Sequence, residues 1–285
     1  MQDLQECRAN LRASYTESVH KLRNDLSKLN RSPIPAPFLS EHNISITEFN
    51  PYDKTLLKSN QFFFDPISLE NYERFRPILR MVCYLEHNHR RKYQASRRRA
   101  LNDPYERASM LYSYFREEIV CIPRKSLETE DRVLAGVAFW DSLKRRERCW
   151  STVEKLHFFT ENDKRDCAIY QPHIGLITLH DDNDKYGSLL LGELAAVAQA
   201  LHDRLSRNRF KRTSLIPVLM ISLFGPQHGR ILQAHYGESG TFNVQMTRCF
   251  DFTTKNDDNI DLSLSFIISG PHLGKQALSY RTGRM

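Results

Sequence analysis

The chain has 285 residues, of which 40% are hydrophobic and 26% charged, and 41 Lys and Arg against 34 Asp and Glu give a net charge of +7. This composition is too apolar for a disordered chain and long enough for one or two buried cores, and its Gly and Pro contents exclude a collagen-like or low-complexity protein. The longest apolar stretch, residues 215–224, is about half as long as a membrane span and contains Pro217, so we expect no membrane span.

The cysteines and the first residues indicate an intracellular protein. The six cysteines are scattered without a C-x-x-C pair, which favours free thiols over a disulfide or a zinc site. Asp3, Glu6, Arg8 and Arg12 lie within the first twelve positions, where a secretory peptide would be apolar. We therefore predict a cytoplasmic or nuclear location.

The first 37 residues are predicted to form a helix followed by a stiff break. Apolar residues recur in steps of three and four over residues 4–29, which is typical of an amphipathic helix with coiled-coil character. Such a helix, taken as the segment 1–31, either packs on the protein's own body or binds a protein partner or a second copy through residues 4–29. Residues 32–37 contain three prolines and read as a linker.

Residues 38–160 are predicted to be mainly helical. Helical periodicity covers residues 67–89, 104–118 and 130–150, and Asp103 followed by Pro104 is a good helix start. Residues 161–285 instead combine apolar runs typical of strands with one long helix over residues 189–205. The sequence therefore predicts an α+β fold, with a helical N-terminal half and a C-terminal antiparallel meander of at least three strands, and a possible seam near residue 160.

Two basic clusters stand out. The first carries six of the positive charges, and three hypotheses compete for it: a solvated helix surface, a nuclear localisation signal, and a phosphate-binding patch for nucleic acid. The second lies at the end of the 189–205 helix, where cations also complement the helix dipole. The members of the first cluster are Arg90, Arg91, Lys92, Arg97, Arg98 and Arg99, and those of the second are Arg204, Arg207, Arg209, Lys211 and Arg212.

No familiar catalytic or metal-binding motif is present. Phosphate-binding glycine loops, nucleophile elbows and H-E-x-x-H helices are missing, so no cofactor is predicted. Adjacent residues on a helix point about 100° apart, so His87 and His89 would not share a face, and the acidic segment 180–184 lacks the Gly and Glu of an EF-hand loop. We therefore predict no metal site.

Weak candidates for a catalytic role are His228, His235, Glu193 and Arg230. Restriction-like nucleases place one acid on a helix and further acids on successive strands, and Glu193 has the helical position. The strands that follow offer Gln233 and His235 where an acid and a lysine should be, which predicts at best a degenerate, inactive version. His235 is expected to share a sheet face with Gln233 and Ile231.

The motifs Gly192-Glu193-Leu194, Gly225-Pro226-Gln227-His228-Gly229-Arg230 and Asp251-Phe252 resemble an uncharacterised family of intracellular proteins from filamentous fungi. The likeness covers residues 187–270. It implies a fungal origin, the helix-plus-meander architecture and, by analogy, an accessory role in secondary metabolism. It implies no activity and no catalytic residues.

Three hypotheses for function follow. The leading one is a protein that binds a partner, through residues 4–29 or the basic run 90–99, without catalysis. The second is an enzyme or accessory factor of a fungal secondary-metabolite pathway, with a pocket between the 189–205 helix and the sheet. The third is a degenerate nuclease-like protein that binds nucleic acid.

Overall fold

A computed structural model describes most of the chain. The described residues are 2–29, 32–59, 61–68, 104–121, 133–137, 141–145, 148–162, 167–182, 187–211, 213–225, 227–252 and 256–272. The basic run 90–99, the segment with His87 and His89, and nearly all of the helix expected over residues 67–89 lie outside these ranges.

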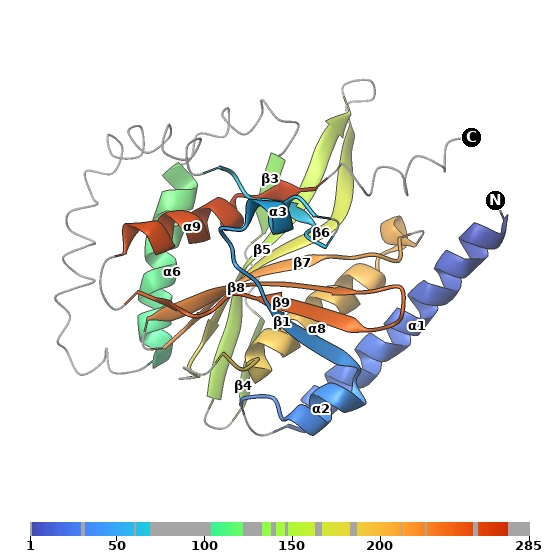
Figure 1. Cartoon of the computed structure of the whole chain (residues 1–285), viewed down its shortest axis with the longest axis horizontal. Coiled ribbons are helices and arrows are strands. Elements are labelled where there is room, and N and C mark those ends of the chain that lie inside the picture. The colour runs from blue at the N-terminus through green and yellow to red at the C-terminus, as the bar shows by residue number, and fades with distance from the viewer. Residues whose placement is uncertain are drawn as a thin grey trace.

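The described strands form two runs of consecutive strands, β3–β6 within residues 133–180 and β7–β10 within residues 218–251, with helices before, between and after them, so the fold is α+β (Figure 1). The helices are α1 (Gln2–Leu26), α2 (Ala36–Glu41), α3 (Lys54–Leu57), α6 (Pro104–Cys121), α8 (Leu191–Leu205), the 3-10 turn η2 (Asn208–Phe210) and α9 (Asp257–Ile267). The strands are β1 (Ile44–Glu48), β2 (Phe64–Asp65), β3 (Val133–Val137), β4 (Asp141–Arg145), β5 (Arg148–Asn162), β6 (Cys167–His180), β7 (Val218–Phe224), β8 (His228–Tyr236), β9 (Phe242–Met246), β10 (Phe250–Asp251) and β11 (Gly270–Pro271).

One mixed sheet runs through the molecule in the order β1-β9-β8-β7-β6-β5-β3, with β10 beside β8 and β4 beside β5. Strands β7, β8 and β9 are antiparallel neighbours, but β6 is parallel to β7 and β1 is parallel to β9. The parallel β6–β7 pair follows from the helical crossover through α8, since a tight turn cannot join parallel strands. The sheet as a whole is therefore mixed, and the three consecutive antiparallel strands within residues 161–285 are β7, β8 and β9.

The prediction of helices in the N-terminal half is only partly right. Helix α6 begins at Pro104 as expected, but residues 130–150 contain β3, β4 and the start of β5 instead of a helix. Both short strands pair with the long strand β5. The apolar run of β3 fits either structure, and pairing with residues 155–159 of β5 decides for a strand. Strand β4 pairs with the start of β5, which follows it directly in the sequence, with Arg145 opposite Arg148.

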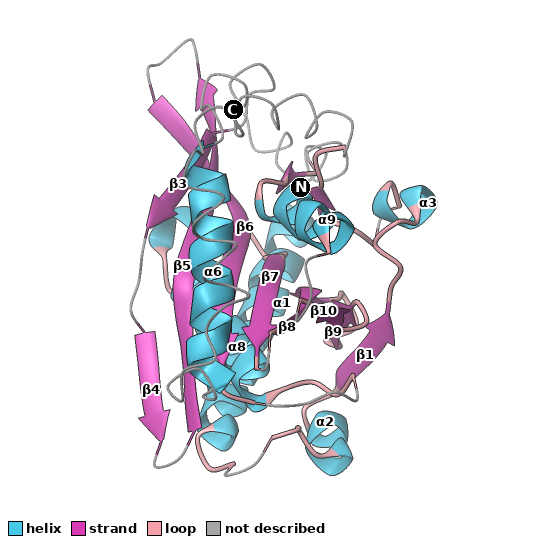
Figure 2. Cartoon of the chain, turned by 90° about the vertical axis from the view of Figure 1, so that its left-hand side faces the viewer, coloured by secondary structure: helices cyan, strands magenta, loops and turns pink. Residues whose placement is uncertain are grey.

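Two apolar cores lie on opposite faces of the sheet. Helices α1, α2 and α8 cover one face, where Val19, Leu22, Leu194 and Met220 are buried. Helices α6 and α9 cover the other face, where Phe62 and Phe64 are buried in the core. Figure 2 shows α6 and α9 in front of the strands, with α1 and α8 behind them.

The sequence regions expected on either side of residue 160 share this sheet. Strands β5 and β6 pair over most of their length, and β1 from the first 50 residues pairs with β9. The Pro-rich segment 32–37 packs as well: Ile34 is buried, and its N–H donates to the carbonyl of Leu189 at 3.0 Å. Helix α2 begins within this segment.

The apolar stripe of α1 is occupied by the protein's own core. Tyr15, Val19, Leu22 and Leu26 are all buried against α8 and the sheet. Tyr15 also stacks on Tyr236 of β8, with ring centroids 4.9 Å apart. Self-association through residues 4–29 remains a prediction, and only the side of α1 that faces away from this core is left for it.

Candidate functional site

Two rows of side chains cross four strands beneath the first turn of α8. The strand register places Thr152, Thr178, Ser222 and Arg230 side by side on β5, β6, β7 and β8. The next level contains Trp150, His180, Phe224 and His228. So many buried polar groups are unusual on a sheet face that is otherwise apolar, and these two rows are therefore a candidate functional site.

A buried ion pair between Glu193 and Arg230 forms the centre of these rows. The Nε and Nη2 atoms of Arg230 donate to the Glu193 carboxylate at 2.7 and 2.5 Å, and neither side chain has more than 1% of its surface exposed. The N–H of Leu190 donates to Glu193 Oε2 at 2.8 Å, and Arg230 Nη2 also donates to the carbonyl of Ser188. Glu193 thus caps α8 and fixes it to β8 in one contact.

The surroundings keep this pair ionised. Burial alone would raise the pKa of Glu193, but the charge of Arg230, its hydrogen bonds and the Leu190 N–H outweigh burial and hold that pKa below its usual value. The guanidinium of Arg230 also lies 5.5 Å from the ring centroid of Phe224. Both carboxylate oxygens are engaged, so Glu193 directs neither of them at a substrate or a metal.

His180 is packed beside the pair and is held neutral. Its Nε2 lies 2.9 Å from the hydroxyl of Thr178, and the side chain is fully buried. Burial lowers the pKa of His180 to about 4, with Glu193 raising it and Arg230 lowering it. An imidazole with this pKa does not exchange protons near neutral pH.

The first turn of α8 lies directly on the His180 imidazole, because Gly192 has no side chain. A methyl group at Gly192 would lie 2.9 Å from Cγ of Trp150 and closer still to the His180 ring. We expect Gly192→Ala to destabilise the protein by about 1–3 kcal/mol through overpacking, despite the better helix propensity of alanine. Urea unfolding would measure this, and an unchanged or higher midpoint would contradict the contact.

The sheet separates the four candidate catalytic residues. Glu193, Arg230 and His228 share the α8 face, where the His228 ring stacks on Phe224 with centroids 6.3 Å apart. His235 lies on the other face, as expected from its alternation with Ile231 and Gln233, and contacts the ring of Phe63. Burial lowers the pKa of His235 to about 4. A single pocket edged by both histidines is therefore not formed.

The opposite end of α8 carries a different arrangement, in which a buried arginine meets two histidines. Arg204 is 2% exposed, and its Nη2 lies 3.0 Å from His157 Nδ1 and donates to the His173 carbonyl at 2.9 Å. Its guanidinium also stacks on Phe210 at 4.6 Å from the ring centroid. Burial, followed by the charges of Arg207 and Arg209, lowers the pKa of Arg204 to about 9.

Next to Arg204, the chain turns through η2 and exposes three cations. Arg207, Arg209 and Lys211 are all solvent-exposed within five residues, and we call these three residues the basic turn. The positive charges also act on the buried His157. Burial is the largest cause that lowers the pKa of His157 to about 4, and the charges of Arg204, Arg207, Lys155 and Arg209 lower it further. The nearby carboxylate of Asp203 already accepts hydrogen bonds from Lys155 and Gln199 at 2.8 and 2.7 Å.

Helix α1 fixes the basic turn in place through Arg12. The Arg12 guanidinium donates to the carbonyls of Phe210 and Thr213 at 2.7 and 2.8 Å, and to that of Leu205. Leu205 is the last residue of α8, so Arg12 supplies a cation and donors where helix carbonyls lack partners. The sequence pointed to the cluster at the end of α8, but nothing in it linked Arg12 to a turn almost 200 residues away.

The buried histidines predict a loss of stability in acid. His157, His173 and His180 have pKa values of about 4, 3 and 4, each lowered first by burial, whereas the unfolded chain protonates them near 6.5. Between these values the unfolded state binds more protons, so stability is full above pH 6.5 and falls toward pH 4. One such histidine accounts for roughly 3 kcal/mol over that range.

Urea midpoints between pH 7.5 and 4.5 measure this effect. We expect the slope of stability against pH to flatten in His180→Asn, because this variant removes an imidazole that the fold keeps neutral. Equal slopes in the native chain and in His180→Asn would contradict the buried, neutral state of His180.

No family model matches the chain, and no curated protein or solved structure matches it. The resemblance to fungal proteins, the intracellular location and the role in secondary metabolism therefore stay predictions. Within the described part of the chain, no helix is long and apolar enough to cross a membrane.

Proposed function

We propose that the protein binds an acidic segment of a partner protein through the basic turn, without catalysing a reaction. The observation that supports this proposal is the exposure of Arg207, Arg209 and Lys211 within five residues at the end of α8. The net charge of +7 also attracts an acidic partner over a longer range.

The N-terminal end of α8 supports a non-catalytic role. A general acid or base must reach substrate and change protonation near neutral pH. Glu193 is buried and ion-paired, and His180 is buried and neutral. The Glu193–Arg230 pair holds the helix on the sheet, and this fixed helix in turn presents the basic turn at its other end.

The geometry favours a protein partner over nucleic acid. Binding to single strands relies on exposed aromatic rings that stack on bases. Among the described residues, the large exposed apolar side chain is Tyr52, which lies beside α3 and not in the basic turn. Three cations within five residues match the spacing of a short run of Glu or Asp.

Fluorescence anisotropy with a labelled polyglutamate peptide tests the proposal. Reversing the basic turn, in Arg207→Glu/Arg209→Glu/Lys211→Glu, should weaken binding at least about tenfold, since each exposed charge pair contributes up to about 1 kcal/mol. The control Lys54→Glu/Lys58→Glu/Arg248→Glu changes the net charge equally at other exposed positions and should retain binding.

Each of the other outcomes would overturn the proposal. Equal losses in the two triple variants would mean that net charge alone attracts the peptide. Tighter binding of a DNA duplex than of the peptide, lost on reversal of the basic turn, would favour the nucleic-acid hypothesis instead. An absence of binding by the native chain at low salt would remove the basic turn as an interface.

A further inference from the structure

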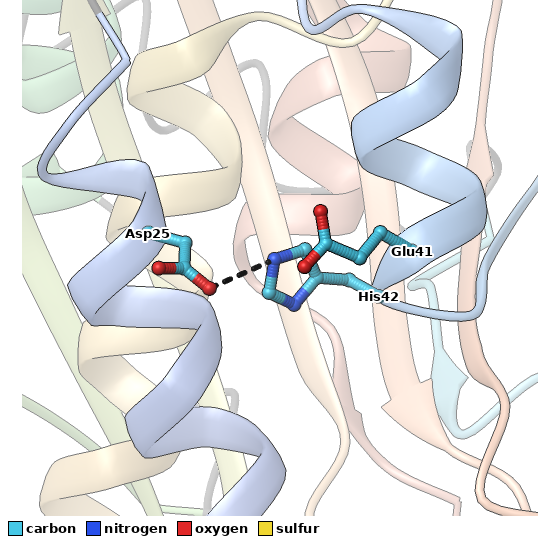
Figure 3. A group of neighbouring side chains, drawn as sticks. All are labelled: Asp25, Glu41 and His42. Carbon is cyan, nitrogen blue, oxygen red and sulfur yellow. Dashed lines mark ion pairs between the residues drawn. The ribbon is translucent and has the colours of Figure 1, made fainter.

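A group of possible metal ligands lies where the end of α1 meets the end of α2, away from both ends of α8. Asp25 is in the last turn of α1, Glu41 is the last residue of α2, and His42 follows it as the C-cap. One ligand atom from each residue lies within 4.8 Å of the other two. Figure 3 shows the Asp25 carboxylate and the His42 imidazole pointing toward each other, with Glu41 beside them.

His42 distinguishes this group from an ordinary pair of surface acids, because its buried imidazole nitrogen lacks a hydrogen bond. The His42 side chain is only 4% exposed, yet its Nε2 has no hydrogen-bond partner and faces Asp25 Oδ2 at 3.5 Å. The ring is held by Phe38, with centroids 4.4 Å apart. A buried nitrogen that is fixed in place and lacks a hydrogen bond is costly unless something satisfies it.

The protonation state suits a metal ligand. Burial lowers the pKa of His42, although Glu41 and Asp25 act to raise it, so the imidazole is neutral at pH 7. Hydrogen bonding to Lys28 lowers the pKa of Asp25, which keeps its carboxylate ionised. Neutral imidazole and ionised carboxylates are the forms that bind metals.

Two lysines share the carboxylates without blocking the site. Lys28 binds Asp25 Oδ1 at 2.6 Å, whereas Oδ2 is the oxygen that faces His42. Lys21 lies 3.3 Å from Glu41 Oε1. Both lysine side chains are more than half exposed, and such surface pairs contribute little and are easily exchanged.

We propose that Asp25, Glu41 and His42 form a binding site for Zn²⁺ or a similar divalent transition metal. One imidazole nitrogen and two carboxylate oxygens are a suitable set of ligands for zinc, which takes such ligands at about 2.0–2.2 Å and leaves a fourth position for water. Tetrahedral geometry needs the donors about 3.4 Å apart, which rotation of the exposed Glu41 side chain provides. The bound ion would join α1 to α2 and stabilise the docking of α1.

Isothermal titration of the full, untagged chain with Zn²⁺, and visible absorption with Co²⁺ as a probe, test this proposal. We expect one ion per chain. His42→Ala should weaken binding at least as much as the roughly 10- to 100-fold that loss of an outer-shell partner costs. His272→Ala is the matched control, because His272 faces the single carboxylate of Asp65, and it should bind as the native chain does.

A second variant separates ligation from folding. Lys28→Ala removes a competing cation and leaves the three ligands in place, so it should bind Zn²⁺ more tightly than the native chain. Circular dichroism of each variant verifies the fold. Absence of saturable binding, equal binding by His42→Ala, or weaker binding by a folded Lys28→Ala would overturn the proposal.

Discussion

Replacing Arg230 by methionine is expected to destabilise the protein by about 3–5 kcal/mol. The substitution leaves the fully buried Glu193 carboxylate without its partner, and an uncompensated buried charge is much more costly than the pair is favourable. It also frees the carbonyl of Ser188, which accepts a hydrogen bond from Arg230. Urea unfolding at pH 7.5 would measure the difference.

The control is the double variant Glu193→Gln/Arg230→Met. Glutamine removes the charge but keeps an oxygen that can accept from the Leu190 N–H, so α8 retains its cap. We expect this double variant to recover most of the lost stability. If the double variant were as unstable as Arg230→Met, the loss would come from packing at Arg230 and not from the unpaired charge.

Deletion of residues 1–31 is expected to abolish cooperative folding. The deleted segment contributes Tyr15, Val19, Leu22 and Leu26 to the core against α8. Each fully buried apolar side chain of this size contributes about 1.5–3 kcal/mol, and four of them together approach the 5–15 kcal/mol of a typical protein. Near-ultraviolet circular dichroism and thermal unfolding of the truncated chain would test this.

A milder variant shows whether the effect comes from the core. Leu22→Ala should cost about 2–5 kcal/mol, whereas Cys7→Ala, at an exposed position of the same helix, should leave the midpoint nearly unchanged. A truncated chain that unfolds cooperatively at the native midpoint would show that α1 is an appendage, and would make residues 4–29 available for a partner.

Local patterns predicted the parts of the fold that depend on neighbours in sequence. The periodicity of three and four residues predicts helices α1, α6 and α8. His235 lies on the same sheet face as Ile231 and Gln233, as expected because successive side chains of a strand point to opposite faces. Strand β3 could not be predicted in this way, because it pairs with residues 155–159 of β5. Strand β4 pairs with the start of β5 directly after it, and the helical interpretation of residues 130–150 missed this local pairing. The parallel pairing of β1 with β9 joins segments about 200 residues apart and leaves no local signal.

The candidate sites show the same limit. Glu193 and Arg230 were singled out separately, but their ion pair joins a helix to a strand 37 residues later and needs the β6-α8-β7 crossover to form. Asp25 and His42 come together only because the Pro-rich segment returns α2 to the side of α1. The basic turn was visible in the sequence because its three cations lie within five residues, whereas the Arg12 contacts that hold it were not.

Hydrogen–deuterium exchange of the full chain, with and without the polyglutamate peptide, would show which residues the peptide contacts. If the basic turn is the interface, the peptide should slow exchange at residues 206–211 and at the end of α8, and should leave the amides of α6 and α9 unchanged. Protection elsewhere with none at residues 206–211, under conditions where the peptide is bound, would contradict an interface at this end of α8.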